Sequence, residues 1–215
     1  MPDDKPASIR DRLIDALMAL AAERPFEDIA ITDIARRAEV SLADFRDAFP
    51  SKGAVLAGFN RRIDRAVLDG ASDSLDGEPA KERLFDVLMR RLDAMAPYKD
   101  AIAGVMKWAR REPIEAAALN RETLNSLRFM LEAADLHAEG AAGAVKLQGL
   151  ALAWGRVLDT WIDDREEEQS ATMAALDKEL TRGANLVARV DDLHRLSAPL
   201  RNIFRAALEG PRAFG

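Results

Sequence analysis

The sequence predicts an all-α protein, on the evidence of three features. Apolar residues recur three or four positions apart, as on one face of an α-helix, and no segment has the strict alternation of a β-strand. Breaks that contain proline or glycine separate these periodic segments. The chain has 215 residues, of which 48% are hydrophobic and 32% charged, a composition typical of a globular protein with a substantial core. We expect nine to ten helices in two domains, residues 1–53 and 54–215.

The first domain is expected to hold three helices. The first begins near Ser8 and ends before Pro25. Two short helices then meet at a tight turn, with Thr32 and Ser41 suited to cap them and Pro50 ending the second. Such a pair has the build of a helix-turn-helix, whose second helix enters the major groove of DNA.

Six further helices and a tail helix are expected after Pro50. Ser51 is suited to cap the first of them, and Pro97 and Pro113 separate later ones. The apolar periodicity places the last three body helices at about residues 113–136, 144–162 and 170–187, and the tail helix at 199–208.

The N-terminal domain resembles that of the TetR family of transcriptional regulators over residues 9–60. The resemblance is carried by Phe26, the run ITDIARRA at 31–38, Val40-Ser41, and Phe49-Pro50-Ser51-Lys52. It implies a homodimeric repressor that holds double-stranded operator DNA through this domain. A small apolar ligand in the C-terminal domain would then tilt the fourth helix, so that the two heads no longer match the half-site spacing.

The resemblance implies a DNA-reading set on and around the second short helix. Its members are Thr32, Arg36, Arg37, Ser41, Leu42, Ala43, Asp44, Arg46, Asp47 and Lys52, with Lys52 as a phosphate contact. Two departures stand out: Glu39 occupies a position where the family usually has glycine, and Asp44 and Asp47 lie on the reading helix. Residues 1–53 hold eight Lys or Arg against eleven Asp or Glu, which disfavours phosphate contact. The alternative is that the head is kept only as a structural cap.

A ligand pocket and a dimer interface are expected in the second domain. The pocket residues are Met95, Ile102, Met106, Trp108, Leu127, Phe129, Met130, Leu131 and Trp154. The interface residues, on two C-terminal helices that could form a four-helix bundle with their copies, are Leu147, Leu150, Leu158, Trp161, Met173, Leu176, Leu180 and Val187. For both sets the alternative is ordinary burial within one chain.

The tail supports a rival function. Residues 195–215 contain four Arg and one Glu, and the apolar face of residues 199–208 could lie on an anionic membrane surface or pack on the body. The body is also similar to the TetR-like lipid-binding accessory proteins of ubiquinone biosynthesis, on the residues Arg91-Leu92, Pro97-Tyr98, the run LDTWIDD at 158–164 and Thr172. That resemblance implies a vestigial DNA-reading head and peripheral contact with a membrane.

Composition argues against several other classes. The chain has no cysteine, so disulfides and thiolate metal sites are excluded. Only two histidines occur, neither with a nucleophile at catalytic spacing, and we expect no catalytic residue, metal site or cofactor. The acidic N-terminus does not have the pattern of a signal peptide, and no run of about 18 apolar residues occurs. We expect a cytoplasmic protein that is not an enzyme.

Overall fold

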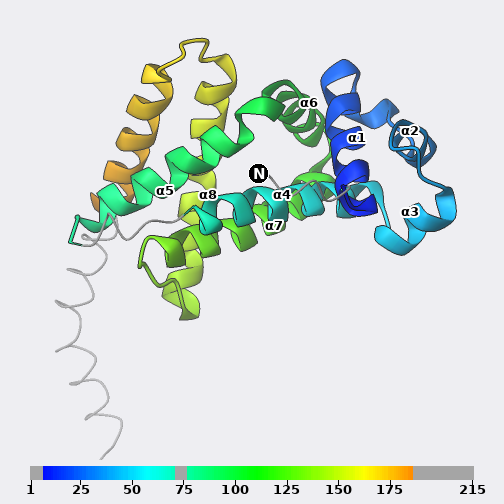
Figure 1. The fold of residues 1–215 in the computed structure, drawn as a ribbon. Coiled ribbons are helices and arrows are strands. Elements are labelled where there is room, and N and C mark those ends of the chain that lie inside the picture. Colours follow the sequence, from blue (N-terminus) through cyan, green and yellow to red (C-terminus); the bar gives the residue numbers. More distant parts are fainter. Residues whose placement is uncertain (1–6, 71–76, 186–215) are drawn as a thin grey trace, which may run out of the picture.

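The computed structural model describes residues 7–70 and 77–185, and these residues confirm the all-α fold (Figure 1). Eight helices, α1 to α8, have defined bounds, slightly fewer than the nine to ten expected, and residues 170–185 form a further helical segment. No β-strand occurs within the two described ranges. The predicted tail helix at 199–208 lies outside them.

The head consists of α1 (Ile9–Glu23), the short 3-10 turn η1 (Phe26–Asp28), α2 (Ile31–Arg37) and α3 (Leu42–Ala48). Figure 1 shows α2 and α3 on the outer side of α1, at one end of the molecule. Ser41 caps α3 as expected, because its hydroxyl accepts a hydrogen bond from the amide of Asp44 at 3.1 Å.

The predicted cap of α2 is wrong. Thr32 lies inside the first turn, because α2 begins at Ile31 after Ala30. The carboxylate of Asp33 instead accepts a hydrogen bond from the backbone N–H of Ala30 at 3.1 Å. Asp33 in the first turn thus satisfies the backbone N–H of the N-cap residue, as the acidic member of a capping box does, whereas no side chain caps the helix in the way expected of Thr32.

The body consists of α4 (Lys52–Asp69), α5 (Ala80–Met95), the 3-10 turn η3 (Ala96–Tyr98), α6 (Lys99–Ala109), α7 (Pro113–Ala133), α8 (Gly140–Asp163) and the segment 170–185. Ser51 caps α4 as predicted, with its hydroxyl accepting from the amide of Ala54 at 3.1 Å. The helix expected from residue 144 starts earlier, at Gly140, where a φ of +69° suits glycine.

Head and body share one continuous hydrophobic core. Helix α1 packs on α4 and α6, and two glycines allow close approach at these contacts. A Cβ on Gly58 would lie 3.2 Å from the side chain of Ile14 on α1 and 2.9 Å from the ring of Phe49. One on Gly104 would lie 2.9 Å from the carbonyl oxygen of Ala21 on α1. The rings of Phe26 and Trp108 also meet across the boundary, tilted by 44° to each other and with centroids 4.6 Å apart. Because these contacts are close, a displacement of the body helices against α1 or α4 would also displace the head.

Candidate nucleic-acid interface and body cavity

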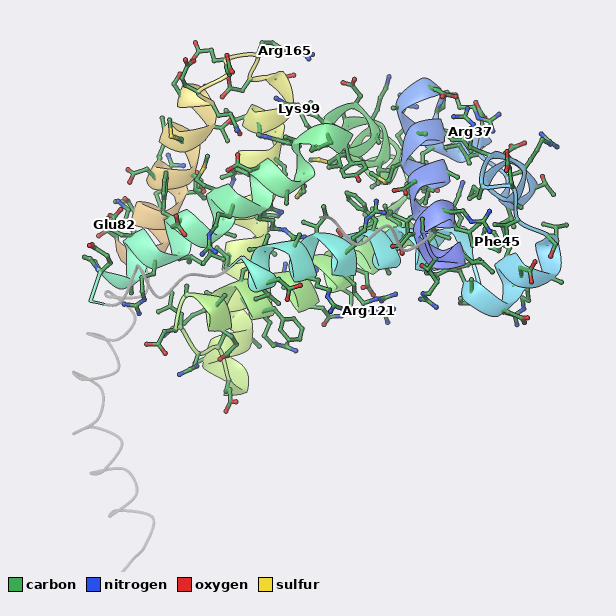
Figure 2. All side chains as sticks on the ribbon, in the orientation of Figure 1. Arg37, Phe45, Glu82, Lys99, Arg121 and Arg165 are labelled. Carbon is green, nitrogen blue, oxygen red and sulfur yellow. The ribbon has the colours of Figure 1, made fainter. Side chains whose placement is uncertain are left out.

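Helix α3 is anchored on one face and free on the other. Phe45 is buried against the rest of the head, and Figure 2 shows it on this outermost helix. The opposite face is exposed, including Leu42, whose side chain is 54% exposed. Exposed residues of the predicted reading set therefore gather on α3 and the turn before it, namely Ser41, Leu42, Ala43, Asp44, Arg46 and Asp47.

Asp44 is engaged at the start of its own helix. Its carboxylate accepts a hydrogen bond from the hydroxyl of Ser41 at 2.7 Å, while its amide donates to that same hydroxyl oxygen. A carboxylate in the first turn is also stabilised by the helix dipole. Asp44 therefore has a structural reason to be acidic, and Asp47, further along α3, has none in the described contacts.

Two predicted DNA-contacting arginines are paired within the head. Arg37 donates two hydrogen bonds to the carboxylate of Glu23, at 2.9 and 2.6 Å, and this pairing raises the pKa of Arg37. Arg36 lies 3.3 Å from the carboxylate of Asp33, but its side chain is 78% exposed. Thr32 and Arg46 are exposed as well. Arg36 and Arg46 are thus the cations most available to a polyanion.

Lys52, the expected phosphate contact, is hydrogen-bonded to the backbone of the head. Its ammonium donates hydrogen bonds to the carbonyl oxygens of Phe26 at 2.7 Å and Ile29 at 2.9 Å. It also lies 4.4 Å from the centroid of the Phe26 ring. Burial lowers the pKa of Lys52, with the carboxylates of Glu115, Glu27 and Asp28 acting in the opposite direction. The described role of Lys52 is to join the start of α4 to η1, and its phosphate contact stays a prediction.

Glu39 has the backbone conformation that glycine adopts without cost. Its φ is +54°, in the left-handed region, and it lies in the turn between α2 and α3. The guanidinium of Arg12 donates to the carbonyl oxygens of Ala38 at 3.1 Å and of Glu39 at 3.4 Å. The turn geometry is therefore retained, and this chain carries local strain where glycine would relieve it.

A cavity of about 130 Å³ lies between helix α1 of the head and helices α4, α5, α6, α7 and α8 of the body. Five predicted pocket residues line it: Met95, Ile102, Met106, Leu127 and Trp154. The lining residues that the prediction missed are Met18, Leu56, Phe59, Asn60, Arg91, Val105, Leu119, Thr123, Ser126 and Leu158.

The other four predicted pocket residues do not line this cavity. Trp108 packs on Phe26 instead, and Phe129 is 55% exposed on α7. Met130 and Leu131 are buried in the core. Adjacent positions on one helix face different directions. The apolar spacing along α7 therefore could not distinguish residues that line the cavity from residues that are buried in the core.

A buried polar cluster forms part of the cavity wall. Arg91 of α5, whose side chain is 4% exposed, pairs with Asp64 of α4, whose side chain is 13% exposed. The hydroxyl of Ser126 on α7 donates to the same oxygen of Asp64. Burial lowers the pKa of Arg91, while the charge of Asp64 opposes that shift. The cluster joins three helices of the body and neutralises the buried cation.

Three solved structures with this fold match nearly their whole length. A TetR transcriptional regulator from Nitrosomonas europaea ATCC 19718 has a TM-score of 0.63 and 26% identity, over 82% of this chain and 98% of its own. A TetR regulator from Rhodococcus sp. RHA1 has a TM-score of 0.58 and 17% identity, over 84% and 97%. A TetR-family regulator from Streptomyces coelicolor has a TM-score of 0.56 and 19% identity, over 94% of both chains. The chain is TetR-like. No protein-family model and no curated protein matches the sequence.

In this TetR-like fold, most of the described residues that were predicted for the dimer interface face the interior of one chain. Leu147, Trp161, Leu176 and Leu180 are buried, Leu150 and Leu158 are partly buried, Met173 is 37% exposed, and Val187 lies outside the described residues. The exposed apolar side chains of α8 are Val145, at 73%, and Leu152, at 58%. A partner could therefore reach a face of α8 that the sequence pattern did not select.

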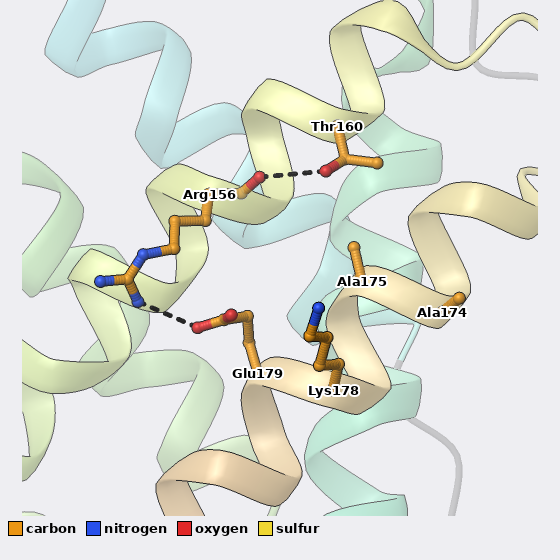
Figure 3. Close-up of a pocket in the computed structure, with 6 residues that line it drawn as sticks. All are labelled: Arg156, Thr160, Ala174, Ala175, Lys178 and Glu179. Carbon is orange, nitrogen blue, oxygen red and sulfur yellow. Dashed lines mark hydrogen bonds and ion pairs between the residues drawn. The ribbon is translucent and has the colours of Figure 1, made fainter.

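A second hollow, of about 280 Å³, lies between α8 and the segment 170–185 (Figure 3). The carboxylate of Glu179 crosses it and accepts hydrogen bonds from Arg156 at 3.0 Å and Arg182 at 2.5 Å. Burial raises the pKa of Glu179, but these hydrogen bonds outweigh that effect and bring the pKa below its ordinary value. The pair between Arg156 and Glu179 joins the segment to α8, whereas Arg182 pairs with Glu179 within the segment.

Neither a metal site nor a membrane span is found in the parts of the chain that the structure describes. No group of three or more His, Cys, Asp or Glu residues there could hold a metal ion. No helix in residues 7–70 or 77–185 is long and apolar enough to cross a membrane.

Proposed function

We propose that this protein is a DNA-binding transcriptional regulator, a ligand-responsive repressor that acts as a homodimer. The observation that supports it best is the geometry of α3. The helix is capped by Ser41 and anchored by Phe45, while its other face is exposed to solvent. A rigid helix that offers exposed side chains at one end of the molecule is the element that a helix-turn-helix protein places in the major groove.

The charged residues of the head determine how strongly it can bind phosphate groups and how that binding depends on salt. Because Arg37 is neutralised by Glu23 and Lys52 is bound to carbonyl oxygens, Arg36 and Arg46 carry the phosphate contacts. Few phosphate contacts give weak non-specific affinity and a shallow dependence on salt. Such a protein depends on base contacts for its affinity. The exposed carboxylate of Asp47 supports such a contact, because a carboxylate can accept a hydrogen bond from cytosine.

Helix α4 supports the ligand response on the head side. Arg62 of α4 donates to the carboxylate of Asp15 on α1 at 2.7 Å and to the hydroxyl of Tyr98 at 3.2 Å. The close approach of Gly58 to Phe49 joins the same helix to the end of α3. A tilt of α4 therefore moves the reading helix.

The same helix supports the response on the body side. Leu56, Phe59 and Asn60 of α4 line the cavity, and Asp64 binds the neighbouring helices through Arg91 and Ser126. A ligand that prefers one position of this wall shifts the equilibrium between DNA-competent and incompetent heads.

A specific observation favours a second candidate, a lipid-binding protein with a vestigial head, acting in ubiquinone biosynthesis at a membrane surface. Two of the cations that the DNA prediction assigned to phosphate, Arg37 and Lys52, are engaged inside the head. The basic tail at 199–208, on which membrane contact depends, lies outside the described residues.

The test is fluorescence polarisation with double-stranded DNA from upstream of the protein's own gene, over a salt series from about 50 to about 200 mM. The wild type is compared with Arg46→Ala and with a matched control, Arg65→Ala. Arg65 carries the same charge but lies near the far end of α4, paired with Asp69. We expect Arg46→Ala to weaken binding and reduce the salt slope by about one, and the control to leave both unchanged.

Absence of salt-sensitive binding to this DNA or to unrelated duplexes would overturn the regulator. Binding to anionic liposomes that is lost on removal of residues 199–208 would then establish the second candidate. Equal weakening by both variants would show that charge alone, and not the α3 surface, governs DNA binding.

A further inference from the structure

Arg10 of α1 is held at the C-terminal end of the reading helix α3. Its guanidinium donates a hydrogen bond of 2.7 Å to the carbonyl oxygen of Ala48, the last residue of α3. The central carbon of the guanidinium also lies 4.2 Å from the centroid of the Phe49 ring, which is a cation–π contact. These two contacts fix a residue of α1, 38 positions earlier in the chain than Ala48, beside the helix that the proposed function places in DNA.

The contacts do not neutralise the positive charge of Arg10. Both partners are uncharged, since one is a carbonyl oxygen and the other an aromatic ring. Within residues 7–49, the basic side chains that form ion pairs with carboxylates are those of Arg24, Arg36 and Arg37, and Arg10 is not among them. Arg10 therefore keeps its charge available, whereas the charge of Arg37 is balanced by Glu23.

Arg10 also has hydrogen-bond donors left for an incoming group. It is an exposed residue, and its contacts with other described residues use only the nitrogen Nη1. A guanidinium carries five N–H donors in a fixed fork, and this fork matches the oxygen atoms of a phosphate. Because Ala48 and Phe49 already hold the group in place, it loses less conformational freedom on binding than a free surface side chain does.

The length of α3 indicates what lies beside its end in a complex with DNA. The helix has seven residues and, at about 1.5 Å per residue, is roughly 10 Å long. The major groove is about 12 Å wide, and its two walls are phosphate backbones. When a helix of this length enters the groove, a cation held at its end therefore lies close to phosphate groups.

We propose that Arg10 is a phosphate contact of the DNA interface, fixed at the end of α3 by Ala48 and Phe49. It adds a cation from α1 to Arg36 and Arg46, which belong to the helix-turn-helix pair itself. The inference rests on the proposed function, because it requires α3 to enter DNA. Since phosphate contacts carry no sequence information, Arg10 contributes equally to the binding of any duplex.

The test is the dependence of DNA affinity on salt, measured by fluorescence polarisation with the full chain. Two duplexes are used, one from upstream of the protein's own gene and one of random sequence. Arg10→Met removes the charge and Arg10→Lys keeps it, while both lose the guanidinium that lies over Phe49. The two variants therefore share any structural effect on α3, and a difference between their salt slopes reports the charge alone.

Arg165→Met is the control for net charge. It makes the same charge change on an exposed arginine of the body, which Figure 2 shows away from the head that carries Arg37 and Phe45. Thermal unfolding of each variant establishes that the fold is retained.

We expect Arg10→Met to reduce the magnitude of the salt slope by about 0.9, and by the same amount on both duplexes. Its loss of affinity relative to the wild type is expected to be largest at low salt. That loss should shrink about three- to fourfold between about 50 and about 200 mM salt. Arg10→Lys and Arg165→Met are expected to keep the slope of the wild type.

Equal salt slopes in Arg10→Met, Arg10→Lys and wild type would overturn the inference. An equal loss of affinity in both variants at every salt concentration would then leave Arg10 with only the structural role of holding α3. A slope reduced as much in Arg165→Met as in Arg10→Met would also overturn it, because the effect would be one of net charge.

Failure of the proposed function has a different signature. In that case the wild type itself shows no salt-sensitive binding, and both proposals fall. Failure of this inference alone leaves the wild type with salt-sensitive binding and Arg46→Ala with a reduced slope, while Arg10→Met keeps the slope of the wild type.

Discussion

Lys52 and Phe26 are joined twice, by a hydrogen bond of 2.7 Å from the ammonium to the Phe26 carbonyl oxygen and by the ammonium lying 4.4 Å from the Phe26 ring centroid. The lysine begins α4, and the phenylalanine begins η1. The same ring packs against the ring of Trp108 on α6. The ring of Phe26 in the head thus contacts both Lys52 at the start of α4 and Trp108 of α6 in the body.

Replacement of Lys52 by methionine is therefore expected to destabilise the whole molecule. The carbonyl oxygens of Phe26 and Ile29 lose the ammonium donor, and that of Phe26 keeps only the backbone N–H of Ile29 at 3.3 Å. We expect a cost of about 1 to 3 kcal/mol in the free energy of unfolding. Chemical denaturation measures the change, with Lys107→Met, an exposed lysine of α6, as control. Equal stability of the two variants would mean that the ammonium makes no net contribution to folding.

Glu39→Gly is expected to stabilise the protein. Because Glu39 has a φ of +54°, glycine removes left-handed strain, and we expect a gain of about 0.5 to 1 kcal/mol. Glu39→Ala is the control, since alanine keeps the strain and removes only the charged side chain. Thermal unfolding distinguishes the two, and an equal gain in both variants would assign the effect to charge.

The position of Glu39 also shows what sequence reasoning could reach. The motif predicted the helix-turn-helix and the caps at Ser41 and Ser51, and the apolar periodicity predicted the all-α class, because these depend on residues close together in the chain. The comparison with the family pattern also marked Glu39 as unusual, and the structure shows the consequence, a non-glycine residue with a φ of +54°.

The candidate sites were predicted less well, because they depend on contacts between distant residues. Arg91 meets Asp64 and Ser126 only after three helices pack, and the apolar pattern gave no sign of that polar cluster. Likewise, the periodicity of α8 identified its buried face, with Leu147 and Trp161, as the surface for a partner. A helix with apolar residues on two faces cannot be oriented from spacing alone.

Asp33 is expected to give the protein part of its sensitivity to acid. The hydrogen bond from the Ala30 amide, together with Arg24 and Arg36, lowers the pKa of Asp33 below its ordinary value. The native state therefore favours the carboxylate, and its contribution is present above the ordinary pKa and lost as pH falls through the lowered one. Denaturation from pH 7 to about pH 3 should show a smaller acid loss for Asp33→Asn than for wild type. Asp47→Asn, which alters an exposed carboxylate of α3, serves as control, and an acid loss in Asp33→Asn as large as that of wild type would contradict the assignment.

Asp47→Asn is expected to strengthen DNA binding under the regulator proposal. The substitution removes an exposed negative charge from α3, where a polyanion would approach, and we expect a roughly two- to fivefold gain in non-specific affinity at low salt. Asp163→Asn makes the same charge change at the exposed end of α8 and should have little effect. A loss of affinity for one particular sequence, together with a gain on random DNA, would identify Asp47 as a base-reading residue.

Leu152→Asp is expected to convert the proposed dimer into a monomer. Val145, Gly149 and Leu152 follow one another at helical spacing on α8, and a Cβ on Gly149 would meet no atom within 4 Å. Two large exposed apolar side chains beside an open glycine suit the close packing of a second copy across a two-fold axis. The molar mass from light scattering decides the oligomeric state. Leu42→Asp is the matched control, because it places the same charge on an equally exposed leucine of α3, far from α8, and should leave the mass unchanged. A monomeric wild type would contradict the dimer itself, whereas a dimeric Leu152→Asp variant would move the interface to another face of the body.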